Sequence, residues 1–121
     1  MAAKKHGLTP IAGIIGICPA PATSKLCARL RLGPSDFDVF ELNEAFASQG
    51  IAVLRQLCIP EDAAHVNPNG GAIALSHPLG VSGARIAGTP ALKLREHGVR
   101  LALATMCIGV GQGIAIALER V

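Results

Sequence analysis

The chain alternates between two kinds of hydrophobic pattern. Short apolar runs bounded by Gly, Pro, Asn or Asp are typical of buried β-strands, and they occur at 11–17, 38–42, 100–106 and 114–118, with a turn or irregular strand expected at 66–75. Apolar residues at helical spacing lie between these runs and predict helices at 23–32, 44–57 and 82–97. The predicted order of elements is therefore βαβαβαββ.

Local signals mark the ends of the predicted helices. Asn43 is expected to cap the second helix and Ser82 the third, because short polar side chains can bond the free backbone N–H groups of a first turn. Gly98 is expected to close the third helix. Pro90 lies inside that helix and predicts a kink, because proline removes one backbone hydrogen bond.

This order predicts an α/β fold in one domain, residues 1–121. Helices placed between strands favour a mixed, mainly parallel sheet of about five strands that is covered by helices. The last two strands are joined by a glycine-rich turn, and a short connection of this kind makes a pair antiparallel. No internal repeat is present in the sequence.

Composition excludes several classes of protein. Half of the residues (50%) are apolar and 16% are charged, so the chain can bury a core. The mean hydropathy is +0.46, but Gly, Pro or charge interrupts every stretch of membrane-spanning length, so no membrane association is expected. A net charge of +3 without a basic block, together with only three aromatic residues, argues against nucleic-acid binding.

The four cysteines contain no Cys-x-x-Cys pair, which argues against a zinc site. An even count permits two disulfides, although reduced thiols in a cytoplasmic protein are the simpler interpretation. The apolar run at 11–17 follows two lysines, as a signal peptide would, but Gly13 and Gly16 interrupt it. A buried strand and a cytoplasmic location are therefore expected.

Polar groups stand at the ends of predicted strands, where open α/β sheets bind ligands. Asn43 ends the second strand, His77 lies in a Ser-His-Pro loop, and Cys107 ends the strand before the glycine-rich turn. Each also has a plainer interpretation, as a helix cap, an idle loop histidine or a small buried hydrophobe. The glycines at 109–113 lack the dinucleotide-binding spacing and are better explained by backbone geometry or by donation from backbone N–H groups.

Three segments resemble, in order and near the expected spacing, the three signature motifs of the thiolases. They are Asn-Glu-Ala-Phe at 43–46, Asn-Gly-Gly-Ala-Ile-Ala-Leu-Ser-His-Pro with Gly80, Ser82, Gly83 and Arg85 at 69–85, and Cys-Ile-Gly-Val-Gly-Gln-Gly at 107–113. The resemblance runs from about Lys4 to Val121 and corresponds to the C-terminal half of a thiolase. It implies one of the two stacked halves of that fold, each of order βαβαβαββ.

The resemblance implies a reversible Claisen condensation of acyl-CoA thioesters, of the kind used in fatty acid or ketone-body metabolism. Cys107 matches the base that moves the α-proton, and His77 matches the histidine that activates the nucleophile and donates to a thioester oxygen. Asn43 matches the residue that holds a water in the same oxyanion hole. The Gly109 N–H matches a donor of a second oxyanion hole, and Phe46 would pack along the pantetheine arm. The family pattern implies no metal and no cofactor beyond the coenzyme A thioester, which is the substrate.

The sequence departs from the thiolase pattern in four places. The motif of the nucleophilic cysteine is missing, as is the loop domain that holds most of coenzyme A. Ser76 stands where thiolases have glycine before the His-Pro pair. An internal segment is predicted to be deleted near residues 17–18.

Two functions therefore stay open, and a ketoacyl synthase half is a weaker third. The chain is either an acyltransferase component that needs a nucleophile-bearing half, or a non-catalytic remnant or interaction module. We expect it to associate with itself or with an N-terminal thiolase half, through apolar faces on two predicted helices. These faces are formed by Ile51, Val53, Leu54, Ile86, Ala87, Ala91, Leu92 and Leu94.

Overall fold

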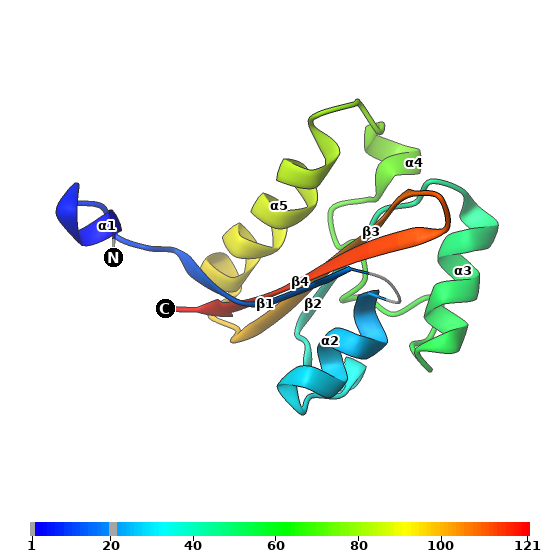
Figure 1. Ribbon diagram of the computed structural model, residues 1–121, viewed down its shortest axis with the longest axis horizontal. Coiled ribbons are helices and arrows are strands. Elements are labelled where there is room, and N and C mark those ends of the chain that lie inside the picture. Colours follow the sequence, from blue (N-terminus) through cyan, green and yellow to red (C-terminus); the bar gives the residue numbers. More distant parts are fainter. Residues whose placement is uncertain (1, 20–21) are drawn as a thin grey trace.

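The structure is a computed structural model that describes residues 2–19 and 22–121. Its elements are α1 (Ala2–Lys5), β1 (Ala12–Pro19), α2 (Ala22–Leu30), the 3-10 turn η1 (Pro34–Asp36), β2 (Val39–Leu42), α3 (Ala47–Gln56), α4 (Ala72–Leu75), α5 (Ser82–His97), β3 (Leu101–Gly109) and β4 (Gln112–Arg120). The strands form one sheet in the order β1-β4-β3-β2. Helix α5 covers one face of the sheet and α2 the other (Figure 1). The α/β prediction is confirmed.

The sheet is mixed, but the expectation of a mainly parallel sheet was wrong. Only β2 and β3 pair in parallel. Strand β4 folds back on β3 through the tight turn, and β1 then adds to the free edge of β4, so both of these pairings are antiparallel. The described sheet has four strands, fewer than the five expected. Strand β1 therefore lies beside β4, the last strand of the chain, and not beside β2.

The strand expected at 66–75 is reduced to a single parallel bridge between Phe40 and Val66. Asn67 has a positive φ of 45°, and Pro68 has no backbone N–H, so the chain cannot continue the ladder. The Asn67 side chain continues it instead: its Oδ1 accepts from the Leu42 N–H at 2.8 Å and its Nδ2 donates to the Leu42 carbonyl at 2.9 Å. The chain then forms α4, a short helix where an irregular strand was expected.

One helix begins later than its capping signal suggested, and another begins one residue earlier. Helix α3 begins at Ala47 with Phe46 as its N-cap, so the expected start at 44 and the cap by Asn43 were wrong. Val81, not Ser82, is the N-cap of α5. In both cases the polar side chain is engaged in tertiary contacts instead. Gly98 closes α5 with a left-handed φ of 66°, as expected, and the helix is assigned without interruption through Pro90.

Apolar side chains form a cluster on each face of the sheet. Phe40 and Leu42 of β2 join the larger cluster, to which α2 and α3 contribute Leu26 and Leu54. Val39 joins the smaller one with Leu94 of α5. Since side chains alternate along a strand, Glu41 lies on the same face as Val39, under α5.

Glu41 is a fully buried carboxyl group without a hydrogen-bond partner. Its exposure is 0%, and neither carboxyl oxygen is bonded. The guanidinium nitrogens of Arg85 on α5 are also buried and unbonded. Loss of hydration raises the pKa of Glu41 to about 7, and the positive charge of Arg85 offsets this only in part. The carboxyl group is therefore protonated over the acidic range in the folded chain.

We expect this group to make the chain less stable as the pH rises. The folded pKa of about 7 exceeds the ordinary value of 4.5, so the folded chain binds one more proton than the unfolded chain between these values. The contribution of Glu41 is complete below about pH 4.5 and is lost as the pH rises to about 7, by roughly 3 kcal/mol. Urea unfolding of wild type and Glu41→Gln across this window should show that the difference between them follows this slope.

Glu61→Gln is the matched control, because Glu61 lies on the surface and pairs with the exposed Arg55. That variant should keep the wild-type pH dependence. If the difference in stability between wild type and Glu41→Gln is flat from about pH 4.5 to 7, the buried carboxyl group does not titrate as described.

Candidate active site

The register of β2 against β3 brings two chemically active residues to one edge of the sheet. The Asp38 carboxylate accepts from the backbone N–H groups of Arg100 and Leu101, both at 2.9 Å, and so fixes where the two strands start. Leu42 then pairs with Thr105 at the other end. The Asn43 N–H donates to the Thr105 carbonyl at 3.0 Å. Asn43 therefore follows β2 at the level of Met106, one residue short of Cys107 on β3.

Asn43 contacts His77, which lies in the loop between α4 and α5. The distance between Asn43 Nδ2 and His77 Nε2 is 3.3 Å. His77 Nδ1 lies 2.5 Å from Ser82 Oγ. Asn43 is buried, and its Oδ1 has no hydrogen-bond partner among the residues that the structure describes. A buried acceptor of this kind can hold a water molecule or a polar group of a ligand.

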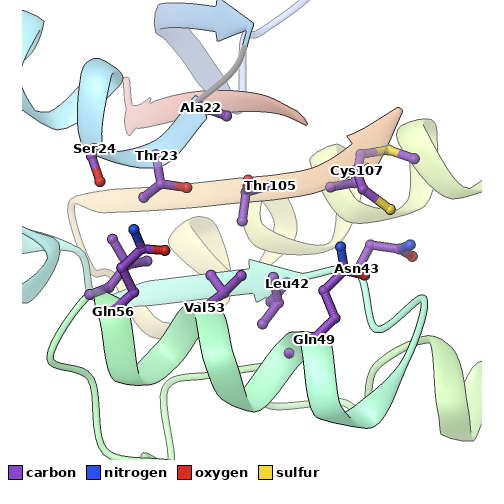
Figure 2. A pocket seen from close by; sticks show the side chains of 13 residues that line it. Ala22, Thr23, Ser24, Leu42, Asn43, Gln49, Val53, Gln56, Thr105 and Cys107 are labelled. Atoms are coloured by element: carbon purple, nitrogen blue, oxygen red, sulfur yellow. The ribbon is translucent and has the colours of Figure 1, made fainter. Parts of the chain in front are cut away.

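A cavity of about 190 Å³ lies beside these residues, between α2 and α3. Figure 2 shows Asn43 and Cys107 at the same end of it. Thr23, Thr105 and Gln49 add polar groups to its wall, and Leu42 and Val53 add apolar ones. The structure thus brings Asn43 to His77 by a hydrogen bond and to Cys107 by a shared cavity, and a small polar substrate could bridge them.

The loop before His77 is held by Glu44, which was expected to lie in the first turn of a helix. The Glu44 carboxylate accepts from Asn67 Nδ2 at 3.1 Å and from the Ile73 N–H at 3.0 Å. Gly71 is required beside it, because a Cβ there would overlap the carboxylate. Glu44 and Asn67 are the positioning residues that the sequence analysis missed. Nothing in their spacing distinguishes them from an ordinary first-turn acid and a loop amide.

The glycines after Cys107 serve a tight hairpin. Cys107 lies inside β3 opposite Gly113, not beyond the strand as expected, and it is partly exposed. A bulge follows between Cys107 and Gly109, and Gly109 has φ of +100°. Val110 and Gly111 also have positive φ, as the favoured two-residue hairpin turn requires. The backbone-geometry interpretation of these glycines is confirmed, and a role for the Gly109 N–H as an oxyanion donor stays a prediction.

The cysteines of the described chain differ sharply in environment. Cys27, Cys58 and Cys107 are free thiols. Burial, followed by the charge of Asp36, raises the pKa of the Cys27 thiol and keeps it protonated. Cys58 is exposed and lies outside the cavity that Cys107 lines. Cys107 is therefore the thiol that the fold presents beside Asn43.

Within residues 2–19 and 22–121, no group of three His, Cys, Asp or Glu side chains could hold a metal ion. No helix of these residues is long and apolar enough to cross a bilayer. Phe46, predicted to pack along a pantetheine arm, is 72% exposed at the start of α3.

Comparison with known protein families shows to which family the chain belongs. Residues 2–120 match the family model described as the C-terminal domain of thiolase. The chain belongs to the thiolase family. The match covers the Asn-Glu-Ala-Phe, His-Pro and Cys-x-Gly segments together, so the resemblance of these motifs is confirmed.

The proteins that are most similar to the chain include thiolases from several organisms. The chain is 58% identical to the β-ketoadipyl-CoA thiolase of Pseudomonas putida, over 99% of this chain and 33% of that protein. It is 54% identical to the 3-oxoadipyl-CoA/3-oxo-5,6-dehydrosuberyl-CoA thiolase of Escherichia coli, over 98% of this chain and 33% of that protein. Among solved structures, human mitochondrial 3-ketoacyl-CoA thiolase in complex with CoA superposes with a TM-score of 0.92 at 42% identity, over 99% of this chain and 33% of that chain.

The chain spans about a third (33%) of the length of these relatives. The alignment with the Pseudomonas putida thiolase extends over 132 residues, more than the 121 of this chain, so that relative carries residues that this chain lacks. A deletion near residues 17–18 stays a prediction, because the side chains of 15–19 and all of 20–21 lie outside what the structure describes.

The loop that carries His77 contains a strained serine. Ser76 has φ of 87° and ψ of 163°, a backbone region that glycine adopts almost alone. This agrees with the observation that Ser76 replaces the glycine of the thiolase motif. Ser76→Gly should therefore raise the free energy of unfolding by about 1 kcal/mol, measured by urea unfolding.

Ser48→Gly is the control, because Ser48 is an exposed residue inside α3, where glycine costs about 1 kcal/mol. The two serine-to-glycine changes should thus have opposite signs. A loss of stability in Ser76→Gly would show that the loop does not hold the backbone conformation described here.

Proposed function

We propose that this chain supplies the proton-transfer part of a thiolase active site, and that it acts with a nucleophile-bearing thiolase part outside these residues. The reaction is the reversible cleavage of a 3-ketoacyl-CoA by coenzyme A. The observation that carries the proposal is that the Asn43 amide and the Cys107 thiol line one cavity, while the His77 imidazole lies 3.3 Å from the Asn43 amide nitrogen. Membership of the thiolase family supports it.

The chemistry follows from what each group can do. In the cleavage direction, a thiol of the partner loses its proton to His77 Nε2 and attacks the 3-keto carbonyl carbon, and the bond between the α-carbon and that carbonyl breaks. The leaving enolate of acetyl-CoA takes a proton from the Cys107 thiol. Coenzyme A then loses its thiol proton to the Cys107 thiolate, which restores the Cys107 thiol, and attacks the acyl group on the partner. The released thiolate of the partner takes back its proton from His77.

Stabilisation of negative oxygen would come from neighbouring donors. Protonated His77 can donate from Nε2 to the thioester oxygen, and Asn43 Oδ1 can hold a water that donates to the same oxygen. The Gly109 N–H would serve the acyl-group oxygen. We propose that the only cofactor is the coenzyme A thioester itself, since proton transfer and thioester exchange need only these groups.

The site is incomplete in this chain, which favours a second candidate function. The chain covers 33% of its relatives and carries no motif of the nucleophilic cysteine. Covalent acyl transfer needs such a nucleophile beside its base. A non-catalytic thiolase remnant, or an interaction module, therefore remains the alternative to a working component.

Apolar side chains surround the site and indicate where a partner would bind. Helix residues expected to be exposed, namely Ile86, Leu94 and Leu54, are instead buried against the sheet of this chain. Ile51 and Leu92 are exposed, as expected. Other exposed apolar residues form an apolar rim that consists of Phe46, Ile73, Leu75, Leu79, Val81, Ile108 and Val110. The segments that carry them lie at the end of the sheet opposite the two chain termini (Figure 1). Covering one such side chain contributes about 1.5–3 kcal/mol.

We predict that the purified chain has no thiolysis activity and gains it when a complementary part is added. The complementary part is the remaining two thirds of a relative such as the Pseudomonas putida enzyme. Cleavage of acetoacetyl-CoA and of 3-oxoadipyl-CoA is followed by loss of the 3-keto thioester absorbance. Turnover in the mixture should fall at least about 100-fold in Cys107→Ala.

Cys58→Ala is the matched control, since it removes an exposed thiol that does not line the cavity and should leave turnover unchanged. Activity of the pure chain that Cys107→Ala alone abolishes would mean that the nucleophile has been assigned to the wrong chain. A stable complex without turnover would favour the interaction module.

We also predict that the chain self-associates at micromolar concentration when no partner is present, because the apolar rim is uncovered. Sedimentation should give a mass above the 12.4 kDa of one chain. Replacing the two most exposed rim residues, by Leu79→Ser with Val110→Ser, should shift the chain towards the monomer without loss of stability.

Leu8→Ser is the control, because Leu8 is 66% exposed but lies near α1, outside the apolar rim. It should leave the association unchanged. A monomer at all concentrations up to tens of micromolar would contradict the prediction.

A further inference from the structure

The ring of His77 is held at both nitrogens, and the contacts differ in kind. Nε2 faces the side-chain amide nitrogen of Asn43 at 3.3 Å. Nδ1 faces the hydroxyl of Ser82 at 2.5 Å. Ser82 was expected to cap a helix, but it is the first residue of α5. The proton distribution on the ring follows from what these two neighbours can donate and accept.

We infer that Ser82 is a positioning residue that fixes His77 in the tautomer protonated at Nδ1, with the lone pair on Nε2. The Asn43 amide nitrogen can only donate, so the contact at 3.3 Å places a donor against Nε2 and requires Nε2 to accept. The Ser82 hydroxyl proton is directed to the Pro78 carbonyl, 3.3 Å away. Its oxygen is then left to accept from the Nδ1–H. Both contacts thus demand the same tautomer.

Ser82 can impose this state because it is itself immobile. It is 3% exposed and is the first residue of α5. Its backbone N–H and its hydroxyl both donate to the Pro78 carbonyl. Pro78 follows His77 directly in the sequence. The two hydrogen bonds from Ser82 to the Pro78 carbonyl therefore hold the backbone next to the imidazole in place. The position and the protonation of the ring are therefore set by one residue.

The consequence for catalysis rests on the proposed function. A lone pair on Nε2, the nitrogen that faces Asn43, allows His77 to take a proton from a thiol on that side. The opposite tautomer would present an N–H there and could not act as a base. Ser82 thus matches the role of the group that orients a catalytic histidine through its other nitrogen.

The tautomer can be measured on this chain whether or not it is an enzyme. With ¹⁵N-labelled histidine at about pH 9, long-range ¹H–¹⁵N correlation spectra show which ring nitrogen carries the proton. The His77 signals are assigned by their loss in His77→Gln. We expect a protonated Nδ1 and an unprotonated Nε2 in the wild type. In Ser82→Ala the signals should move towards the Nε2–H form, which free histidine prefers.

Ser76→Ala is the matched control, because Ser76 is an exposed serine of the same loop whose φ is positive with either side chain. It should keep the wild-type pattern, and Ser82→Thr, which restores a hydroxyl, should return the ring to it. A wild-type ring protonated at Nε2, or a Ser82→Ala ring that still carries its proton on Nδ1, would overturn the inference. The wild-type result alone is decisive, so misfolding of a variant does not obscure it. A failed thiolysis assay with the expected tautomer would refute the proposed function and leave this inference standing.

Discussion

The parallel pairing of β2 with β3 is the constraint on which the candidate site depends. Asp38 ties the start of β2 to the first residues of β3, and the register then places Leu42 opposite Thr105. Asn43 consequently leaves the sheet beside the end of β3 that carries Cys107. A slip of one residue would turn every side chain of β2 to the other face. It would remove Phe40 from the larger apolar cluster and carry the Glu41 carboxyl group into it, so the core itself protects the register of the site.

Side-chain amides and carboxylates extend the hydrogen bonding of the sheet to the loop that carries His77. Asn67 takes the place of a missing strand residue beside Leu42, and Glu44 ties Asn67 to the segment that leads to His77. The same two residues therefore support the outer edge of the sheet and the loop that carries the imidazole. Substitution of Asn67 or Glu44 would therefore affect the position of His77 indirectly, through the segment that leads to it. This explains how a loop as rich in Gly, Ser and Pro as 70–83 can hold a catalytic geometry.

The sequence patterns predicted most of the helices and strands, but they did not predict all of the contacts that these elements make. The apolar runs located β1 to β4 closely, and the motifs identified Asn43, His77 and Cys107 because chemistry-bearing residues followed predicted strands. The pattern failed where tertiary contacts outcompeted local ones: Asn43 bonds His77 and not a helix end, and Asn67 with Pro68 ends the expected fifth strand after one bridge. The exposed apolar surface was also misplaced, because helical spacing shows that a face is apolar and not which layer covers it. Ile86 and Leu94 face their own sheet, and the apolar rim lies around the site.

In the function proposed here, the chain presents one side of an acyl-transfer site, and the rest of a thiolase lies against its open edge. The central claim is that Cys107 moves the α-proton of an acyl-CoA. It is tested most directly by exchange of the acetyl protons of acetyl-CoA in D₂O, in a mixture with the complementary thiolase part whose own nucleophilic cysteine is replaced by alanine. Exchange needs only the base and the oxyanion donors, so the account predicts that it proceeds and falls about 100-fold or more in Cys107→Ala but not in Cys58→Ala. Exchange at the same rate without the Cys107 thiol would contradict it.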